Sequence, residues 1–151
     1  MRRACTVLAV LLALTLFTAC SAPLTPEKLA QKIFGTPKKA EDSGIEKVSF
    51  SGSSLVIEYR LFPTGLTSYT KELGISLCPK LQQIYRESKE IDEVTILALG
   101  PFSDKLGNTT WKPMAALTVD RKLITQDIKW DTFLKQDLLA VAKDVQVFRD
   151  E

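Results

Sequence analysis

Residues 48–61 read VSFSGSSLVIEYRL and contain the clearest β-hairpin pattern in the chain. Apolar and polar side chains alternate on both sides of the turn at Ser51–Ser54, and alternate side chains of a strand point to the same face. The alternation in the second strand predicts a buried face made of Leu55, Ile57, Tyr59 and Leu61. A hairpin with one apolar face needs a covering layer, which the flanking segments must supply.

A short helix is predicted before the hairpin and a longer one after it. Thr25, Pro26 and Gly35 have the positions of an N-cap, a first helical residue and a stop for a helix over 26–34. After the hairpin, large apolar residues recur at helical spacing, namely Tyr69, Leu73, Leu77, Leu81, Ile84 and Tyr85. Pro79 interrupts this pattern, so we expect a kink or two helices divided near Cys78.

The second half of the chain predicts further strands and a closing helix. Residues 94–99 and 111–119 are expected to form strands joined by a long polar loop, and Pro113 indicates an edge or a bulge. Residues 120–122 predict a turn and 123–130 a short strand. Asp131 is then expected to cap a helix with an apolar stripe of Leu134, Leu138, Val141 and Val145.

Together these elements predict an α+β fold in a single domain over residues 26–151. Strands joined by short turns pair antiparallel, and the apolar stripes of the helices need a partner. We therefore expect an antiparallel sheet of four to five strands with helices packed on one face, in the order α-ββ-α-ββ(β)-α. A domain of this size buries roughly two thirds of its unfolded surface, which is enough for a core without disulfides.

The first 19 residues have the pattern of a secretory signal peptide. Arg2 and Arg3 precede the apolar run Ala4–Ala19, which is shorter than the roughly 18 to 20 residues that a membrane-spanning helix needs. The signal peptide is therefore excluded from the fold. Without its two arginines, the rest of the chain has 18 basic and 18 acidic residues. A neutral domain offers no basic stripe for phosphate groups, so nucleic acid is not an expected partner.

The end of the signal peptide, LFTACS at residues 16–21, resembles the lipobox of bacterial lipoproteins, although Phe17 stands where leucine is usual. The resemblance implies that Cys20 carries a diacylglyceryl lipid, with acyl chains such as palmitate, and becomes the first mature residue. Residues 20–25 would then form the lipidated cysteine and a tether of at most about 17 Å. Ser21 implies sorting to the outer membrane, facing the periplasm, in a Gram-negative cell. The alternative is ordinary cleavage after Ala22.

Few residues are available for catalysis. The chain has no histidine and three cysteines, of which Cys78 is the one thiol expected in the mature domain. We interpret Cys78 as a small buried residue of the helix stripe, and the acidic residues Glu90, Asp92 and Glu93 as a solvated turn and not a cation site. No metal and no cofactor is therefore expected.

The loop from Gly100 to Trp111 is the predicted contact region. Its candidate partner-binding residues are Phe102, Asp104, Lys105 and Trp111, because interfaces combine aromatic anchors with a polar rim. The alternative is that the two aromatic rings pack back onto the sheet edge.

We therefore predict a lipid-anchored lipoprotein of the cell envelope whose domain is not an enzyme. It would bind a protein near the membrane or a small ligand. The alternative function is a small envelope hydrolase that uses Cys78 or carboxylates such as Asp127 and Asp131.

Overall fold

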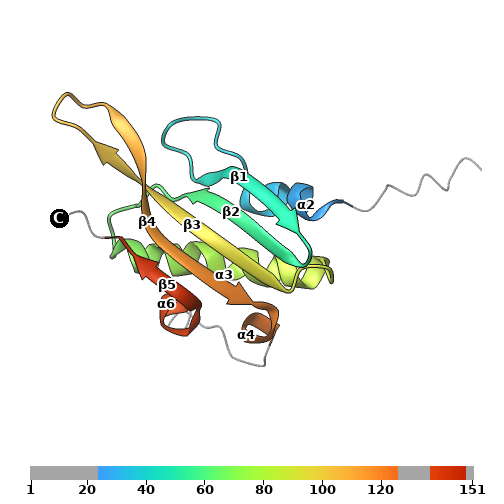
Figure 1. Cartoon of the computed structure of the whole chain (residues 1–151). Coiled ribbons are helices and arrows are strands. Elements are labelled where there is room, and N and C mark those ends of the chain that lie inside the picture. The colour runs from blue at the N-terminus through green and yellow to red at the C-terminus, as the bar shows by residue number, and fades with distance from the viewer. Residues whose placement is uncertain (1–23, 126–136, 149–151) are drawn as a thin grey trace, which may run out of the picture.

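The computed structural model describes residues 24–125 and 137–148 (Figure 1). In chain order the elements are α2 (Pro26–Phe34), β1 (Gly44–Ser51), β2 (Ser54–Arg60), α3 (Tyr69–Glu87), β3 (Glu93–Ser103), β4 (Thr109–Asp120), α4 (Arg121–Thr125), α6 (Leu138–Val141) and β5 (Lys143–Val147). The predicted signal peptide, Cys20 and most of the tether lie outside the described residues.

The five strands form one sheet in the order β1-β2-β3-β4-β5. Neighbouring strands are antiparallel except β2 and β3, which run parallel, with Leu55 opposite Val94 and Arg60 opposite Leu99. The α+β class is confirmed. The purely antiparallel sheet is wrong, because the sheet is mixed.

The length of α3 explains the parallel pair. Its 19 residues span about 28 Å, whereas the seven residues of β2 span about 23 Å. A helix of that length returns the chain to the end of the sheet where β2 began, and the next strand must then run in the same direction as β2. Helix α3 is therefore a crossover as well as a cover for the sheet, which the ββα order by itself did not predict.

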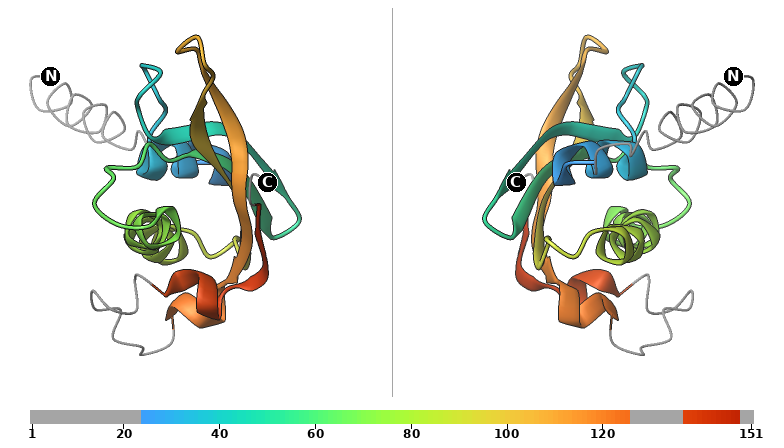
Figure 2. Two further views of the ribbon diagram at one scale, coloured as in Figure 1. Left: turned by 90° about the vertical axis from the view of Figure 1, so that its left-hand side faces the viewer. Right: turned by 90° about the vertical axis from the view of Figure 1, so that its right-hand side faces the viewer.

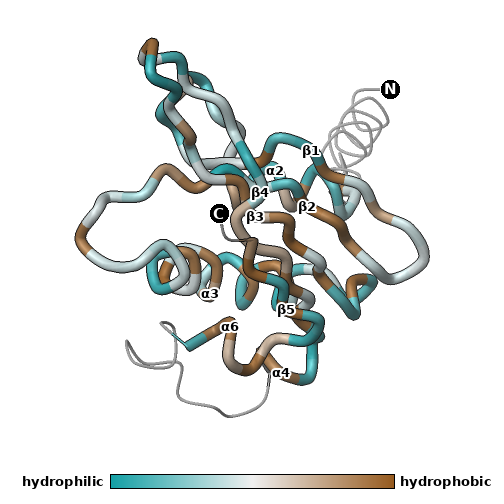
Figure 3. The backbone as a smooth tube through the Cα atoms, turned by 60° about the vertical axis from the view of Figure 1, so that its left-hand side comes forward, coloured by the Kyte–Doolittle hydropathy of each residue, from teal (hydrophilic) through white to brown (hydrophobic). Residues whose placement is uncertain are grey.

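Helices α2 and α3 cover one face of the sheet, whereas no helix among the described residues covers the other face (Figure 2). The predicted buried face of β2 is confirmed, since none of its four apolar side chains is more than 5% exposed. In α3, the core side chains are Leu73, Leu77, Leu81 and Ile84, all fully buried. Figure 3 shows the hydrophobic residues along the central strands that form this core.

Both predicted ends of α2 are confirmed. The hydroxyl of Thr25 accepts a hydrogen bond from the amide of Lys28 at 3.4 Å, and Pro26 is the first helical residue. Gly35 has a φ of 79°, a conformation that glycine adopts without steric cost, and it ends the helix. Phe34 packs edge-on against Tyr59 with the ring centroids 5.8 Å apart, which attaches α2 to the sheet.

The predicted break in α3 is wrong, because one helix runs through Pro79 to Glu87. Pro79 and Ile75, whose carbonyl loses its helical donor, both lie on the exposed side of the helix. The buried stripe on the opposite side keeps its contacts with the sheet. Packing of that stripe therefore compensates for the missing backbone hydrogen bond.

The expected long loop between the third and fourth strands is also wrong. Strand pairing continues through Phe102 opposite Thr110 and Ser103 opposite Thr109, so only residues 104–108 form the hairpin turn. The bulge expected from Pro113 is confirmed, since the register shifts between Ala98 and Leu99, and Leu99 pairs with Pro113. The polar residues of this segment are those of an extended, exposed hairpin.

The C-terminal part differs most from the prediction. Residues 121–125 are helical where a turn and the start of a strand were expected, and the rest of that strand lies outside the described residues. Of the predicted closing helix, only Leu138–Val141 is observed as helix. Val145 lies in β5, which pairs with the otherwise open edge of β4. The edge of β4 presents backbone N–H and C=O groups that a strand can pair with. A helix cannot pair with them, because its own backbone groups bond within the helix.

Gly44 gives a direct test of the packing between β1 and the loop that precedes it. A methyl group on this residue would lie 2.9 Å from the carbonyl oxygen of Gly35 and from Cδ of Pro37. We therefore expect Gly44→Ala to lower the free energy of unfolding by about 1–3 kcal/mol in urea titrations. Ser49→Ala, an exposed change on the same strand, should stay within about 0.5 kcal/mol of the parent protein. Equal stability of the two variants would contradict this account of the packing.

Candidate functional site

Three loops lie at one end of the sheet and form the candidate binding region. Because β2 and β3 are parallel, both finish at the same end, where β1 and β4 start. We call this end, made of residues 36–43, 61–68 and 104–108, the loop end. Helix α3 also begins there, and the β3–β4 hairpin extends beyond the rest of the sheet (Figure 1).

A cavity of about 420 Å³ opens at the loop end, within the size range of small-molecule sites. It lies between the residues that follow β2 and the first turns of α3. Its apolar wall contains Leu61, Phe62, Leu66 and Ile75. The side chains of Glu72 and Ser76 are among the polar groups of the wall.

Glu72 orders the loop that forms one side of this cavity. It is 9% exposed, and its carboxylate accepts hydrogen bonds from the Thr64 amide at 2.6 Å, the Thr64 hydroxyl at 3.0 Å and the Thr67 amide at 3.3 Å. These bonds, first of all that from the Thr64 amide, hold the pKa of Glu72 below its usual value. Glu72 is thus an ionised structural group and not a general acid.

Tyr59, Ser76 and Lys80 form a polar cluster beside the cavity. The ammonium of Lys80 donates to Tyr59 Oη at 2.7 Å and to Ser76 Oγ at 3.2 Å, and the two hydroxyl oxygens are 2.9 Å apart. Lys80 Nζ also lies 4.8 Å from the ring centre of Tyr59 and 5.8 Å from that of Phe34. The Lys80 ammonium is thus placed as a hydrogen-bond donor to both hydroxyls and as a cation beside two aromatic rings.

The sequence contains one local signal for this cluster, although none of its members was among the predicted site residues. Ser76 and Lys80 are four residues apart, and residues at that spacing are neighbours on one helix face. Tyr59 was correctly assigned to the buried face of β2. Only the packing of α3 on β2, however, brings its hydroxyl to the same point.

The tip of the β3–β4 hairpin is held in one conformation by Asp104. Its carboxylate accepts from the Leu106 amide at 2.8 Å and from the amide and side chain of Asn108, each at 2.9 Å. The bonds from Asn108 lower the pKa of Asp104. Asp104 therefore forms the turn, whereas Leu106 in the same turn is 87% exposed. Lys105, also at the tip, is exposed.

Phe102 and Trp111 lie on opposite faces of the hairpin. Phe102 pairs with Thr110 and Trp111 with Pro101, and residues one position apart in a strand point to opposite sides. Phe102 is 39% exposed, with Lys112 Nζ 3.6 Å from its ring centre. Phe102 and Trp111 therefore do not form one patch.

Trp111 is half-buried and packs against the sheet. Its ring centre is 6.4 Å from that of Phe62 and 5.0 Å from the guanidinium of Arg60, which pairs with Glu46 at 2.5 Å. The alternative that the aromatic rings pack back onto the sheet therefore holds for Trp111. Phe102 remains available to a partner.

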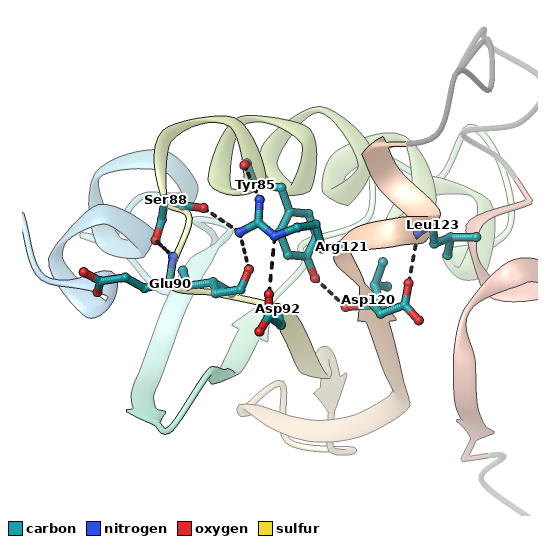
Figure 4. A network of polar contacts seen from close by, with 9 residues as sticks. Tyr85, Ser88, Glu90, Asp92, Asp120, Arg121 and Leu123 are labelled. Atoms are coloured by element: carbon teal, nitrogen blue, oxygen red, sulfur yellow. Dashed lines mark hydrogen bonds and ion pairs between the residues drawn. The ribbon is translucent and has the colours of Figure 1, made fainter.

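A second polar network lies at the opposite end of α3 (Figure 4). The guanidinium of Arg121 donates to the carbonyl oxygens of Tyr85 at 2.7 Å, Ser88 at 2.6 Å and Ile91, and its Nε lies 3.6 Å from the carboxylate of Asp92. These contacts cap the C-terminus of α3 and fix the turn into β3. The network is therefore structural.

Among the residues that the structure describes, the other candidate groups do not form a catalytic site. Cys78 is fully buried, which agrees with its interpretation as a core residue and keeps substrates away from its thiol. Within residues 24–125 and 137–148, no three metal-ligating side chains are grouped closely enough to hold an ion. Asp127 and Asp131 lie outside the described residues.

Comparison with known proteins identifies no relative. No protein-family model matches the chain, and neither does any curated protein or solved structure. Among the helices that the structure describes, none is long and apolar enough to cross a membrane.

The loop held by Glu72 should be sensitive to acid. Because the pKa of Glu72 is lower in the folded protein than in the unfolded chain, its ionised form stabilises the fold above about pH 4.3. This stabilisation is lost as the pH falls through the folded pKa. We expect Glu72→Gln to be less stable than the parent protein near pH 7, with a difference that shrinks below about pH 4.

Urea unfolding at a series of pH values measures this difference. Glu41→Gln, which changes an exposed carboxylate near the loop end, is the matched control and should show no such pH-dependent difference. A difference for Glu72→Gln that stays constant down to pH 3 would contradict the assignment.

Proposed function

We propose that this chain is a lipid-anchored lipoprotein of the cell envelope whose domain binds a protein partner through the β3–β4 hairpin and is not an enzyme. The single observation that carries the binding role is the hairpin tip. A turn ordered by Asp104 displays Leu106 to solvent, with Phe102 exposed on the adjoining strand.

The hairpin tip is preorganised for binding, because its turn is ordered before a partner is bound. An exposed leucine contributes nothing to the stability of its own fold, whereas its burial in a partner releases about 25 cal/mol for each Å² of apolar surface. Because the turn is already ordered by three hydrogen bonds to Asp104, binding loses little additional loop entropy. Lys105 and Lys112 place positive charge around the apolar groups, which suits a partner surface that combines an apolar pocket with acidic residues.

The positions of Leu24 and the hairpin tip support a different approach of the partner from the membrane-proximal one expected from the sequence. Leu24, the first described residue, lines a surface pocket together with Glu87 and Ser88, at the C-terminal end of α3. The hairpin tip lies at the other end, where α3 begins (Figure 1). An anchor attached through residues 20–25 would therefore leave from the end opposite the tip. We accordingly propose a partner that approaches the membrane-distal end of the domain, in place of one held against the membrane.

The anchor itself is tested by mass spectrometry of the mature N-terminus. We expect a chain that begins at Cys20 and carries the mass of a diacylglyceryl group, and we expect Cys20→Ala to lose membrane association. An unmodified chain that begins at Pro23, after cleavage at Ala22, would show that the lipobox resemblance is misleading.

The binding role is tested by crosslinking in the envelope followed by capture of the chain. Phe102→Ala and Leu106→Ala should each weaken capture of the partner about fivefold or more, with unchanged thermal stability, because both side chains are exposed. Trp111→Ala should lower thermal stability, because it removes the contacts with Phe62 and Arg60.

Val56→Ala is the matched control for this experiment. Val56 is 42% exposed and lies near the β1–β2 turn, at the other end of the sheet from the hairpin tip. It should retain full capture. Loss of capture in Val56→Ala with retention in both hairpin variants would move the interface to the open face of the sheet.

A further inference from the structure

We propose that the cavity at the loop end binds a free amphipathic carboxylate of the fatty-acid type. Its headgroup would lie at the cluster of Tyr59, Ser76 and Lys80, and its hydrocarbon chain along the apolar wall of the cavity. The residues of this site differ from those of the hairpin tip.

The charge of Lys80 favours an anionic ligand. Its side chain is partly buried between α3, α2 and β2, where water is partly excluded. The ion pairs found in the described part of the chain join other residues, and none supplies a carboxylate to Lys80. A partly desolvated cation favours an anionic neighbour. The two aromatic rings offset only part of that need.

The hydrogen-bond donors of the cluster also favour a carboxylate. The ammonium of Lys80 has three N–H groups and uses two of them on Tyr59 and Ser76. Of the two hydroxyls, one donates to the other, so one hydroxyl hydrogen is left over. The cluster therefore offers one N–H and one O–H to an acceptor outside it, which matches the two oxygens of a carboxylate.

The apolar wall of the cavity favours a ligand with a hydrocarbon chain. Phe62, Leu66 and Ile75 surround the cavity and are 40%, 86% and 41% exposed, so an occupant would cover large apolar side chains that the fold leaves open. Leu61, 5% exposed, adds a buried apolar surface. These side chains match a hydrocarbon chain.

Glu72 determines the orientation of the ligand. Glu72, Ser76 and Lys80 follow one another at intervals of four residues along the same stripe of α3. The negative charge of Glu72 repels a carboxylate from the N-terminal end of this stripe, and the ammonium of Lys80 attracts it to the other end. The headgroup therefore belongs beside Ser76, and the chain extends toward Phe62 and Leu66.

The choice of a free ligand over a lipid in the bilayer rests on the lipid anchor proposed above. The cavity lies at the start of α3, and Leu24, which leads to the tether, lies beside the end of this helix. About 17–22 Å of helix separates Glu72 and Ser76 of the cavity from Glu87 beside Leu24. A single-chain carboxylate in the aqueous compartment reaches the cavity directly, whereas an acyl chain within the membrane does not.

Equilibrium dialysis of radiolabelled octanoate against the full chain in lipid nanodiscs tests the proposal, with empty nanodiscs as the blank. We expect saturable binding of one octanoate per chain above the blank. Hexanoate, shorter by two methylene groups, should bind up to about tenfold more weakly. Octanol, which keeps the chain and lacks the charge, should compete at least about tenfold more weakly than octanoate.

Lys80→Met separates charge from packing, because methionine keeps an unbranched side chain against the two rings. It should weaken octanoate binding at least about tenfold. Arg86→Met is the matched control, since it removes one positive charge from the exposed surface of the same helix, about 15 Å beyond Ser76. It should bind octanoate as the parent protein does.

A second variant keeps the test decisive if Lys80→Met folds poorly. Ile75→Asp adds a negative charge to the cavity wall at an exposed position, so the fold should tolerate it while octanoate binding weakens. The proposal is overturned by binding to the nanodiscs alone, by equal binding of octanol and octanoate, or by equal losses in Lys80→Met and Arg86→Met.

Discussion

The packing of α3 across β2 and β3 is the constraint on which the rest of this structure depends. The helix buries Leu73, Leu77, Leu81 and Ile84 against the apolar face of the sheet and at the same time connects two parallel strands. Because the helix is long enough to return the chain along the full length of β2, β3 starts beside the start of β2, with Ser54 opposite Glu93. The loops that follow β2 and β3 therefore meet at one end of the domain, together with the first turn of the helix.

Several polar groups can be understood as consequences of this packing. The hydroxyl of Tyr59 is carried into the interface by an otherwise apolar face, and Ser76 and Lys80 supply the partners that a buried hydroxyl requires. At the two ends of α3, Glu72 satisfies amides of the preceding loop and Arg121 satisfies carbonyls of the following turn. The helix is thus connected by hydrogen bonds at both ends as well as by its apolar stripe.

The loop end combines two surfaces that differ in chemistry. The hairpin tip presents apolar side chains on an ordered turn, whereas the cavity has an apolar wall and contains Ser76, whose hydroxyl accepts a hydrogen bond from Lys80. Phe62 connects them, because it lines the cavity and also packs against Trp111. An occupant of the cavity would therefore contact a side chain that supports the base of the hairpin.

Local pattern in the sequence alone determined α2 with its caps, the β1–β2 hairpin and the buried faces of β2 and α3, since caps, turns and apolar periodicity act over a few residues. It also determined the α+β class and the buried position of Cys78. Only the tertiary structure decided that α3 continues through Pro79, that β2 and β3 run parallel, and that Val145 joins a strand. Each of these features depends on a segment that is distant in the chain. The helix packs on the surface of the sheet, β3 pairs with β2 after the crossover, and β5 pairs with the edge of β4. The same reason applies to the cluster of Tyr59, Ser76 and Lys80, whose members meet through the packing of one element on another.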